Sequence, residues 1–406
     1  MLLNDDLYEL AKCIGLLRAT QGATCVSIKL LADFQVPVNH RHKRKDVVLK
    51  IGIVGLSLVG KTTLFRILTH AHSGKIGKPE THVGVVKVPD PRLDRLAEMF
   101  HPQKLVHTSI EYVDTPASVI QLARTGTQSA ALKEMDALVH VVRAFEDSAT
   151  PAEGGAVDPK RDIESVELEL ILSDLAIIEK RMERLEKDIK KQKNPALEKE
   201  RQALVKAKQA LEGQKPLREL GLSADEELAL RGFTFLSLKP MLYVLNLGEK
   251  DAARTDAADE FAQEAGLKQR PRTAVTAVCG KIEEELSELS EAEAAEFLAS
   301  YNLKESAISR LIRSSYGLLG LISFFTVGED ECRAWTIREG STALDAAGEI
   351  HSDIQRGFIR AEVVSYTDLI DVAGSFAEAR SRGVLKLEGK EYVVHDAEIV
   401  HFRHSG

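Results

Sequence analysis

The sequence GLSLVGKT at residues 55–62 constrains the fold of this chain more than any other feature. Glycines at both ends of the loop let backbone N–H groups point inward at an anion, because no side chain blocks its approach. The preceding run, residues 47–54, is apolar and β-rich, and residues 62–70 have a helical pattern. This strand–loop–helix order predicts a phosphate-binding loop, in which the helix N-terminus adds partial positive charge.

Two residues of the loop have distinct expected roles. The Lys61 amine should reach the β- and γ-phosphates of a nucleotide, and the Thr62 hydroxyl should ligate Mg²⁺. Farther along, Asp114 ends the strand-like run 109–113. A carboxylate there is placed to hold Mg²⁺, and the alternative is the cap of a helix or turn. The residues predicted to contact nucleotide phosphates are Ser57, Leu58, Val59, Gly60, Lys61, Thr62 and Thr63.

The base should be contacted by the segment that follows the apolar run 240–245, where Asn246, Leu247 and Glu249 stand. GTPases carry Asn-Lys-x-Asp at this place, and its aspartate accepts hydrogen bonds from guanine. Here leucine replaces the lysine, and glutamate, which is longer by one methylene, replaces the aspartate. The carboxylate is therefore displaced, which weakens GTP as the substrate without proving ATP.

Strand-like runs alternate with helical ones in this part of the chain, which predicts a doubly wound α/β domain. The further runs span residues 83–88, 109–113, 136–142, 240–245 and 273–278. Between residues 161 and 213 apolar residues recur every three to four positions, with an interruption at Asn194-Pro195. This pattern predicts an antiparallel coiled-coil hairpin. Its charged outer face is either a partner surface or a solvated face.

The chain becomes helical again over residues 283–315 and β-rich after Gly317, which predicts a small, separate α+β domain. Strands are expected at 322–327, 333–337, 359–365, 384–387, 392–394 and 399–402, and helices at 342–354 and 376–381. Basic and aromatic residues are mixed in this region. They either contact RNA phosphates and bases or divide between a small core and the surface. Examples are Arg333, Trp335, Arg356, Phe358, Arg360 and Arg403.

Bulk composition narrows the class of protein. A length of 406 residues predicts two or three domains, and a net charge of -8 argues against a uniformly basic chain. No apolar run is long enough to span a membrane, and the four cysteines lack metal-ligand spacing, so a cytoplasmic protein with free thiols is expected. The basic run at residues 40–45 is read as part of a flexible leader, with a nucleic-acid-binding arm as the alternative.

Several of these segments together resemble the YchF/Obg-like ATPase family of TRAFAC-class P-loop proteins. The matching stretches are VGKTTLF (59–65), VGVVKVPDPRLDRLAE (83–98), HVVRAFED (140–147), FFTVGEDECRAWTI (324–337) and IHSDIQRGFIRAEV (350–363). The resemblance covers about residues 48–404. It implies a P-loop domain with a coiled-coil insert and a C-terminal TGS domain of β-grasp form. It also implies a preference for ATP and a regulatory association with ribosomes.

The resemblance adds two candidate residues. The family has a histidine with a proposed catalytic role at the position of His140, for which the alternative is a histidine buried in a strand. The Mg²⁺-binding threonine of the first switch has its nearest match at Thr81, although this switch is about four residues short. The family also usually has asparagine where Leu58 stands, and Asp-Ile-Ala-Gly where this chain has Asp114-Thr115-Pro116-Ala117.

The predicted domains are an N-terminal extension (1–47), a P-loop domain (48–152 and 236–315), a helical insert (153–235) and a TGS domain (318–404). The predicted function is a Mg²⁺-dependent ATPase that acts as a switch on the ribosome or RNA, bound through the insert and TGS domains. Lys61 and His140 are its candidate catalytic residues, and Thr62, Thr81 and Asp114 its candidate metal ligands. A regulator or RNA-binding scaffold with little hydrolysis and a GTPase remain as alternatives.

Overall fold

The computed structural model describes residues 49–70, 82–114, 129–147, 155–191 and 194–405. The basic run at 40–45, Thr81 and residues 115–118 lie outside these ranges, so predictions about them remain predictions. No helix in the described ranges is both long enough and apolar enough to cross a bilayer. Of the four cysteines, Cys279 and Cys332 lie inside these ranges, and both are buried free thiols.

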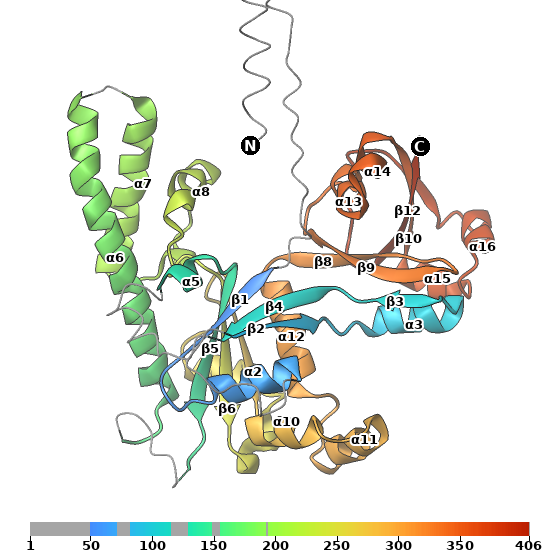
Figure 1. Ribbon diagram of the computed structural model, residues 1–406, viewed down its shortest axis with the longest axis horizontal. Helices are drawn as coiled ribbons and strands as arrows, with labels where there is room; N and C mark the ends of the chain where they lie inside the picture. The colour runs from blue at the N-terminus through green and yellow to red at the C-terminus, as the bar shows by residue number, and fades with distance from the viewer. Residues whose placement is uncertain (1–48, 71–81, 115–128, 148–154, 192–193, 406) are drawn as a thin grey trace, which may run out of the picture. The chain divides into compact units, whose positions relative to one another are not determined.

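A six-stranded sheet has the order β2-β4-β1-β5-β6-β7 (Figure 1). All neighbouring strands are parallel except β2 and β4. Every residue of β6 is buried, as expected for a strand that helices cover on both faces. The predicted strands of this sheet are confirmed as β1 (Lys50–Val54), β2 (His82–Lys87), β4 (Ser109–Asp114), β5 (Ala137–Ala144), β6 (Met241–Leu247) and β7 (Thr273–Val278).

Helices of the same region follow these strands in the chain. The region predicted to be helical over residues 283–315 is confirmed, and three helices occupy it and its flanks. Ser290 and Ser306 each cap a new helix with their side chains, which divides the stretch. The helices here are α2 (Lys61–Thr69), α5 (Ser129–Lys133), α9 (Ala258–Glu264), α10 (Gly280–Leu286), α11 (Glu291–Ser300) and α12 (Ala307–Leu318), with the 3₁₀ helix η4 (Glu249–Arg254).

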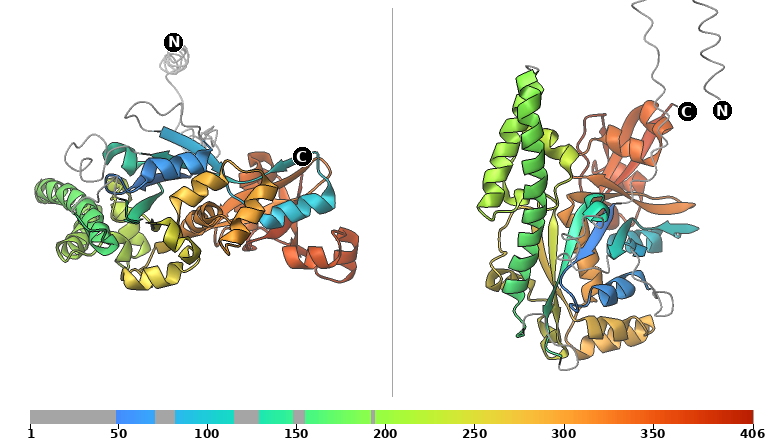
Figure 2. Two further views of the ribbon diagram at one scale, coloured as in Figure 1. Left: turned by 90° about the horizontal axis from the view of Figure 1, so that it is seen from below. Right: turned by 60° about the vertical axis from the view of Figure 1, so that its left-hand side comes forward.

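The predicted helical hairpin is present as α6 (Pro159–Lys191) and α7 (Pro195–Glu212), which lie side by side in Figure 2. The Asn194 side chain caps α7 at its first turn, and Pro195 fits there because it lacks an N–H group. Arg181 and Glu200 form an ion pair between the two helices. The chain returns to the sheet through η2 (Leu217–Glu219), α8 (Ala224–Leu230) and η3 (Arg231–Phe233).

A second six-stranded sheet, of order β11-β10-β12-β8-β9-β3, forms the C-terminal domain. The predicted strand at 392–394 is wrong, since only an isolated bridge joins Thr342 to Val393. The predicted helix at 342–354 is two helices, because His351 has an extended backbone that interrupts it. The elements are β8 (Leu321–Thr326), β9 (Glu331–Arg338), α13 (Ala343–Ile350), α14 (Ser352–Arg356), β10 (Phe358–Ser365), α15 (Tyr366–Asp371), α16 (Phe376–Ser381), β11 (Lys386–Glu388) and β12 (Glu398–His404).

One segment from the first part of the chain belongs to this second sheet. Helix α3 (Pro91–Phe100) and strand β3 (Lys104–Val106) follow β2, and β3 pairs in parallel with β9. Leu93 and Leu96 of α3 are fully buried in the same cluster as Phe325 and Cys332. Neither element was predicted from the sequence. The doubly wound sheet, the hairpin and the C-terminal α+β domain are all present, whereas the domain boundaries given above stay a prediction.

Candidate nucleotide site

The phosphate-binding loop connects β1 to α2, and its two glycines adopt conformations that few other residues can. Gly55 has φ 148° and Gly60 has φ 98°. A Cβ atom on Gly55 would lie 2.5 Å from the Val141 carbonyl oxygen, and one on Gly60 would lie 2.5 Å from the Asn246 side chain. Glycine is therefore required at both positions because neighbouring strands approach the loop closely.

Lys61 and Thr62 are the first two residues of helix α2, directly after Gly60. The buried Lys61 amine donates hydrogen bonds to the carbonyls of Leu56 (2.6 Å) and Gly55 (3.3 Å), so it lies under the loop. The Thr62 hydroxyl donates to a carboxylate oxygen of Asp114 at 3.0 Å. The structure thus brings the predicted phosphate-binding lysine and two of the predicted metal ligands together.

Asp114 reaches this place because β4 lies beside β1, with Ile53 and Asp114 in register. Its side chain is fully buried, and burial raises the pKa of the carboxyl, while the Thr62 hydroxyl and the Lys61 charge oppose this shift. One carboxylate oxygen, Oδ1, has no hydrogen-bond partner among the described residues. A buried carboxylate with an unused oxygen beside a threonine hydroxyl is the oxygen donor set that Mg²⁺ takes.

The top of the loop differs from that of the family that the sequence resembles. Leu58 stands where asparagine is usual, and it has φ 60° with 61% of its surface exposed. Asparagine tolerates this left-handed conformation better than leucine does, so the substitution adds backbone strain here. Its neighbour Val59 is 2% exposed and belongs to the core of this domain.

The amide of Asn246 connects two parts of the site. It donates to the Val59 carbonyl at 3.1 Å and accepts from the Gly280 N–H at 3.1 Å. Asn246 thereby fixes the phosphate-binding loop against the first turn of α10. Its predicted contribution to the nucleotide site stays a prediction, but the contacts indicate that it positions the loop.

A cavity of about 460 Å³ adjoins the loop at Gly60 and Thr63, and its volume is typical of small-ligand sites. Leu247 and Glu249 line it, and their predicted contact with the nucleotide base stays a prediction. The Glu249 carboxylate forms an ion pair with the Lys281 amine at 2.8 Å, so its charge is already partly neutralised.

Three residues to which the sequence pattern assigned no role also line this cavity: Phe145, Glu146 and Asp147. The Arg143 guanidinium lies 4.4 Å from the centre of the Phe145 ring, and its Nε donates to the Phe145 carbonyl at 3.0 Å. These residues follow β5 directly. Their position could have been inferred, because ligands bind outside the carboxyl ends of parallel strands and residues 136–142 have the pattern of such a strand.

His140, the second candidate catalytic residue, lies inside the sheet. It is 1% exposed, its ring centre lies 5.5 Å from that of Tyr243, and neither ring nitrogen has a hydrogen-bond partner among the described residues. Burial lowers the pKa of His140 to about 3, with smaller contributions from the charges of Arg218 and Lys61. This environment favours the alternative of a neutral core histidine, and its catalytic role stays a prediction.

Comparisons with known proteins find relatives that match most of this chain. The model of the family YchF-GTPase_C, described as a protein of unknown function (DUF933), matches residues 321–405. The chain is 41% identical to the ribosome-binding ATPase YchF of Bacillus subtilis over 366 residues, which are 88% of this chain and 99% of that protein. It is 39% identical to the ribosome-binding ATPase YchF of Escherichia coli O157:H7 over 361 residues, 87% of this chain and 98% of that one.

A solved structure extends the similarity to three dimensions. The Schizosaccharomyces pombe YchF GTPase has 30% sequence identity and a TM-score of 0.74, over 87% of this chain and 97% of that one. The match therefore extends over most of this chain and nearly all of that one. A phosphate-binding loop backed by Thr62 and Asp114, with relatives matched over nearly their whole length, places this chain in the YchF family.

Proposed function

We propose that this chain is a Mg²⁺-dependent ATPase whose nucleotide state controls its binding to the ribosome in the cytoplasm. The observation that carries the proposal is the hydrogen bond of 3.0 Å between the Thr62 hydroxyl and Asp114, beside the buried Lys61 amine. In this arrangement Thr62 and Asp114 would supply metal ligands, and Lys61 the cation, for phosphoryl transfer from a nucleotide. The names of the bacterial relatives, ribosome-binding ATPase YchF, support the same activity.

Mg²⁺ fits the residues present, because Thr62 and Asp114 offer only oxygen donors. The metal would neutralise negative charge on the phosphates when bound. Lys61 would turn from the carbonyls of Gly55 and Leu56 towards the phosphates, since a phosphate oxygen is a stronger acceptor for an ammonium group. The backbone N–H groups at the start of α2 would bind the same phosphates.

Adenine suits the base cavity better than guanine does. Guanine recognition needs a carboxylate that accepts two hydrogen bonds, whereas Glu249 is occupied by Lys281 and longer than the aspartate of GTPases. Phe145 offers an apolar wall against which either purine could pack. The preference for ATP therefore rests on the Glu249–Lys281 pair.

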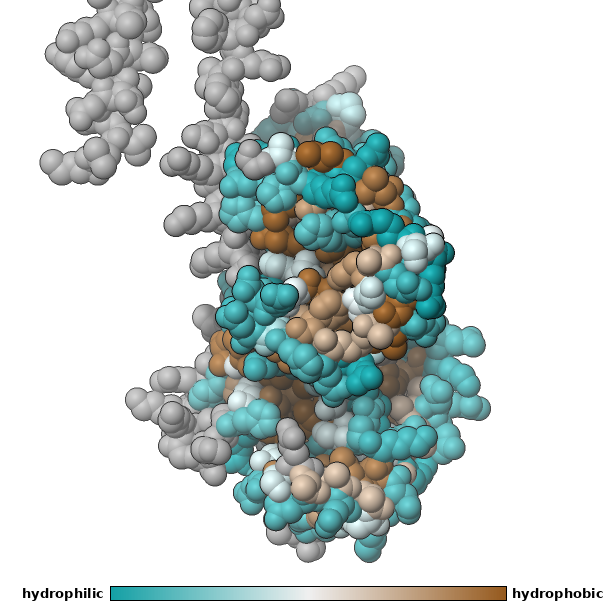
Figure 3. All heavy atoms as spheres, turned by 90° about the vertical axis from the view of Figure 1, so that its right-hand side faces the viewer, coloured by the Kyte–Doolittle hydropathy of each residue, from teal (hydrophilic) through white to brown (hydrophobic). Residues whose placement is uncertain are grey.

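We propose that the ribosome is contacted through the hairpin and the C-terminal domain. Figure 3 looks onto the right-hand side of Figure 1, where the C-terminal domain lies, and shows hydrophobic patches separated by hydrophilic residues. Such a mixed surface suits charged and hydrogen-bonded contacts with RNA or ribosomal protein more than one continuous apolar interface.

Titration calorimetry with Mg²⁺ and each nucleotide tests the site and the base preference together. We expect ATP to bind more tightly than GTP, and Lys61→Ala to weaken both. Tighter binding of GTP would instead support the second candidate, a GTPase, which is how the Schizosaccharomyces pombe relative is described.

Turnover is proposed to be slow, because Ser118 and Val119 occupy the sequence position at which Ras-like enzymes carry the glutamine that orients the attacking water. A single-turnover measurement of phosphate release tests hydrolysis separately from binding. If the unchanged protein binds nucleotide but releases phosphate no faster than the Lys61→Ala variant, the alternative of a regulator without hydrolysis is supported. If co-sedimentation with ribosomes is the same with and without nucleotide, the alternative of an RNA-binding scaffold is supported.

A further inference from the structure

A second cavity, of about 570 Å³, lies at the amino-terminal ends of strands of the first sheet, opposite to the nucleotide site. Three residues that line it come just before strands of this sheet. Asp136 directly precedes β5, Lys239 lies two residues before β6, and Arg272 directly precedes β7. The nucleotide site is at the carboxyl ends of these strands, so the second cavity is separate from it. Residues of α8, of η3 and of the end of β9 complete the lining.

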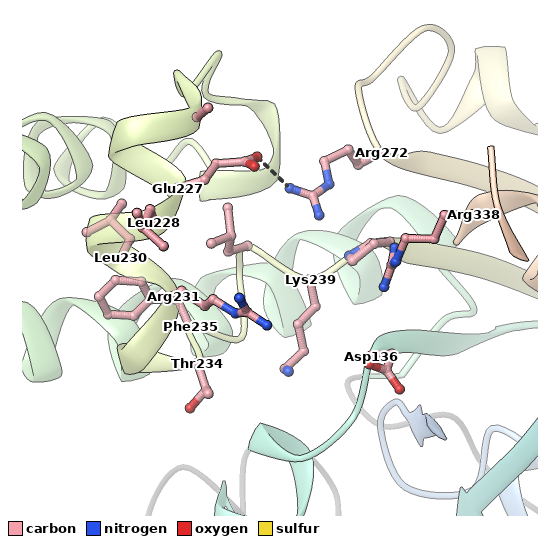
Figure 4. Close-up of a pocket in the computed structure, with 13 residues that line it drawn as sticks. Asp136, Glu227, Leu228, Leu230, Arg231, Thr234, Phe235, Lys239, Arg272 and Arg338 are labelled. Atoms are coloured by element: carbon pink, nitrogen blue, oxygen red, sulfur yellow. Dashed lines mark hydrogen bonds and ion pairs between the residues drawn. The ribbon is translucent and has the colours of Figure 1, made fainter. Parts of the chain in front are cut away.

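Three guanidinium groups surround this cavity. In Figure 4 the side chains of Arg231, Arg272 and Arg338 come from three different elements and point into one space. Arg272 has a long ion pair with Glu227, at 3.5 Å. Within the described ranges the structure gives Arg231 and Arg338 no ion-pair partner.

Lys239 adds positive charge, and two of the three N–H donors of its amine bond to the protein itself. Its amine donates to the carbonyl oxygens of Lys133, at 3.0 Å, and Met135. Burial lowers the pKa of this amine, and the carboxylates of Asp136 and Asp174 oppose the shift. Asp136 itself accepts the backbone N–H of Lys50 at 2.9 Å.

Around this cavity three arginines and Lys239 face two carboxylates, Glu227 and Asp136, so positive charge is in excess. Like charges repel one another, and a concave surface concentrates their field. An anion in the cavity would offset the repulsion between the guanidinium groups and accept hydrogen bonds from several N–H groups at once. Planar guanidinium groups match the oxygen pairs of a phosphate, which makes phosphate the anion that the geometry favours.

The rest of the lining favours a small ligand over a nucleic-acid backbone. The carboxylates of Glu227 and Asp136 flank the arginines and would repel a polyanion that continued past them. Leu228 is 69% exposed at the same cavity and supplies an apolar wall. The volume lies within the ~300–1,000 Å³ typical of small-molecule sites.

We propose that this cavity binds a small phosphorylated molecule, with its phosphate held by Arg231, Arg272 and Arg338 and its organic part against Leu228. The proposal does not depend on the activity at the phosphate-binding loop.

Calorimetric titration of the full chain with inorganic pyrophosphate and with phenyl phosphate tests this proposal. Both titrations use the Lys61→Ala background, which suppresses phosphate binding at the loop. We expect Arg231→Gln and Arg338→Gln each to weaken both probes about tenfold or more, the effect of one charged hydrogen bond. Leu228→Ala should weaken phenyl phosphate and leave pyrophosphate unchanged.

Arg382→Gln is the matched control, because Arg382 is an exposed arginine of the C-terminal domain outside this cavity. Thermal unfolding checks that each variant is folded. Equal losses in Arg382→Gln and Arg231→Gln, or no saturable binding of either probe, would overturn the proposal. So would a single-stranded RNA oligonucleotide whose binding needs Arg231 and Arg338 while neither small probe binds.

Discussion

At the scale of single residues, the environment of a side chain decides its chemistry. Asp114 and His140 end up in one sheet, on the two strands that flank β1, and both are buried. Burial disfavours the charged form of each, so it raises the pKa of the carboxyl and lowers that of the imidazole. Asp114 differs in having the Lys61 amine and the Thr62 hydroxyl beside it, which supports the proposal that it binds a metal ion.

Asp114→Asn should remove most of the Mg²⁺-dependent part of ATP affinity, because an amide oxygen carries no charge to bind the metal. In the unchanged protein, Mg²⁺-dependent affinity should fall as the pH drops through the raised pKa of Asp114, since the metal needs the ionised carboxylate. Calorimetry with and without Mg²⁺ over a pH series measures both effects. A variant that keeps the full Mg²⁺ response would exclude Asp114 as a ligand.

His140 should make the protein less stable in mild acid. The unfolded chain binds a proton at this residue below pH 6.5, whereas the folded chain does so only near pH 3. The free energy of unfolding should therefore decrease by about 2 kcal/mol from this residue between pH 7 and pH 5. Denaturant unfolding of the His140→Gln variant should show a smaller decrease over that range. An equal decrease would show that His140 is not the buried neutral group described here.

At the scale of elements, a buried ion pair connects the hairpin to the first sheet. Arg218 of η2 pairs with Glu167 of α6, and both contact the Tyr243 hydroxyl on β6. The Arg218 side chain is fully buried, so its charge depends on Glu167. Tyr243 in turn contacts His140 on the neighbouring strand. The two ends of the hairpin are thus held against strands whose carboxyl ends lie beside the proposed base cavity.

Glu167→Leu should lower the free energy of unfolding by roughly 3–5 kcal/mol, because Arg218 would then be a buried charge without a partner. The double variant Glu167→Leu/Arg218→Met should recover most of this loss, since it removes both charges and keeps apolar volume. Chemical denaturation of the three proteins measures the difference. If the double variant is no more stable than the single one, the ion pair is not the origin of the loss.

At the scale of the whole molecule, the segment between β2 and β4 joins the two sheets. β4 carries Asp114, and the segment before it contains β3, which is a strand of the C-terminal sheet. Arg92 at the start of α3 bonds both Asp90 and Asp396, the second at 2.6 Å. A shift of β4 at the proposed metal site would therefore act on the C-terminal domain through covalent and packed contacts.

Leu96→Ala should destabilise this junction by about 2–5 kcal/mol, the usual cost of truncating a fully buried leucine. Leu105→Ala, on β3 and 40% exposed, is the matched control and should cost much less. Limited proteolysis should cut Leu96→Ala faster around residues 91–106 than the control. Equal cleavage of both variants would argue against packing of α3 as the source of the connection.

Local features of this protein follow from the order of its residues. The loop at 55–62, the strand-like runs and the hairpin with its break at Asn194 are encoded in neighbouring residues, so pattern and spacing identify them. Thr62 and Asp114 could be paired from sequence because Asp114 ends one strand and Thr62 follows the loop after another. The carboxyl ends of neighbouring parallel strands lie on the same side of the sheet.

The meeting of distant segments is a property of the folded chain. β3 has three residues and joins the second sheet far from its neighbours in the chain, so no local pattern could assign it there. The Glu249–Lys281 pair, the burial of His140 and the convergence of Arg231, Arg272 and Arg338 likewise depend on contacts between elements. Local charge, the pKa of a side chain and the shape of a pocket depend on neighbours from distant parts of the chain. The order of residues in the sequence does not specify these neighbours.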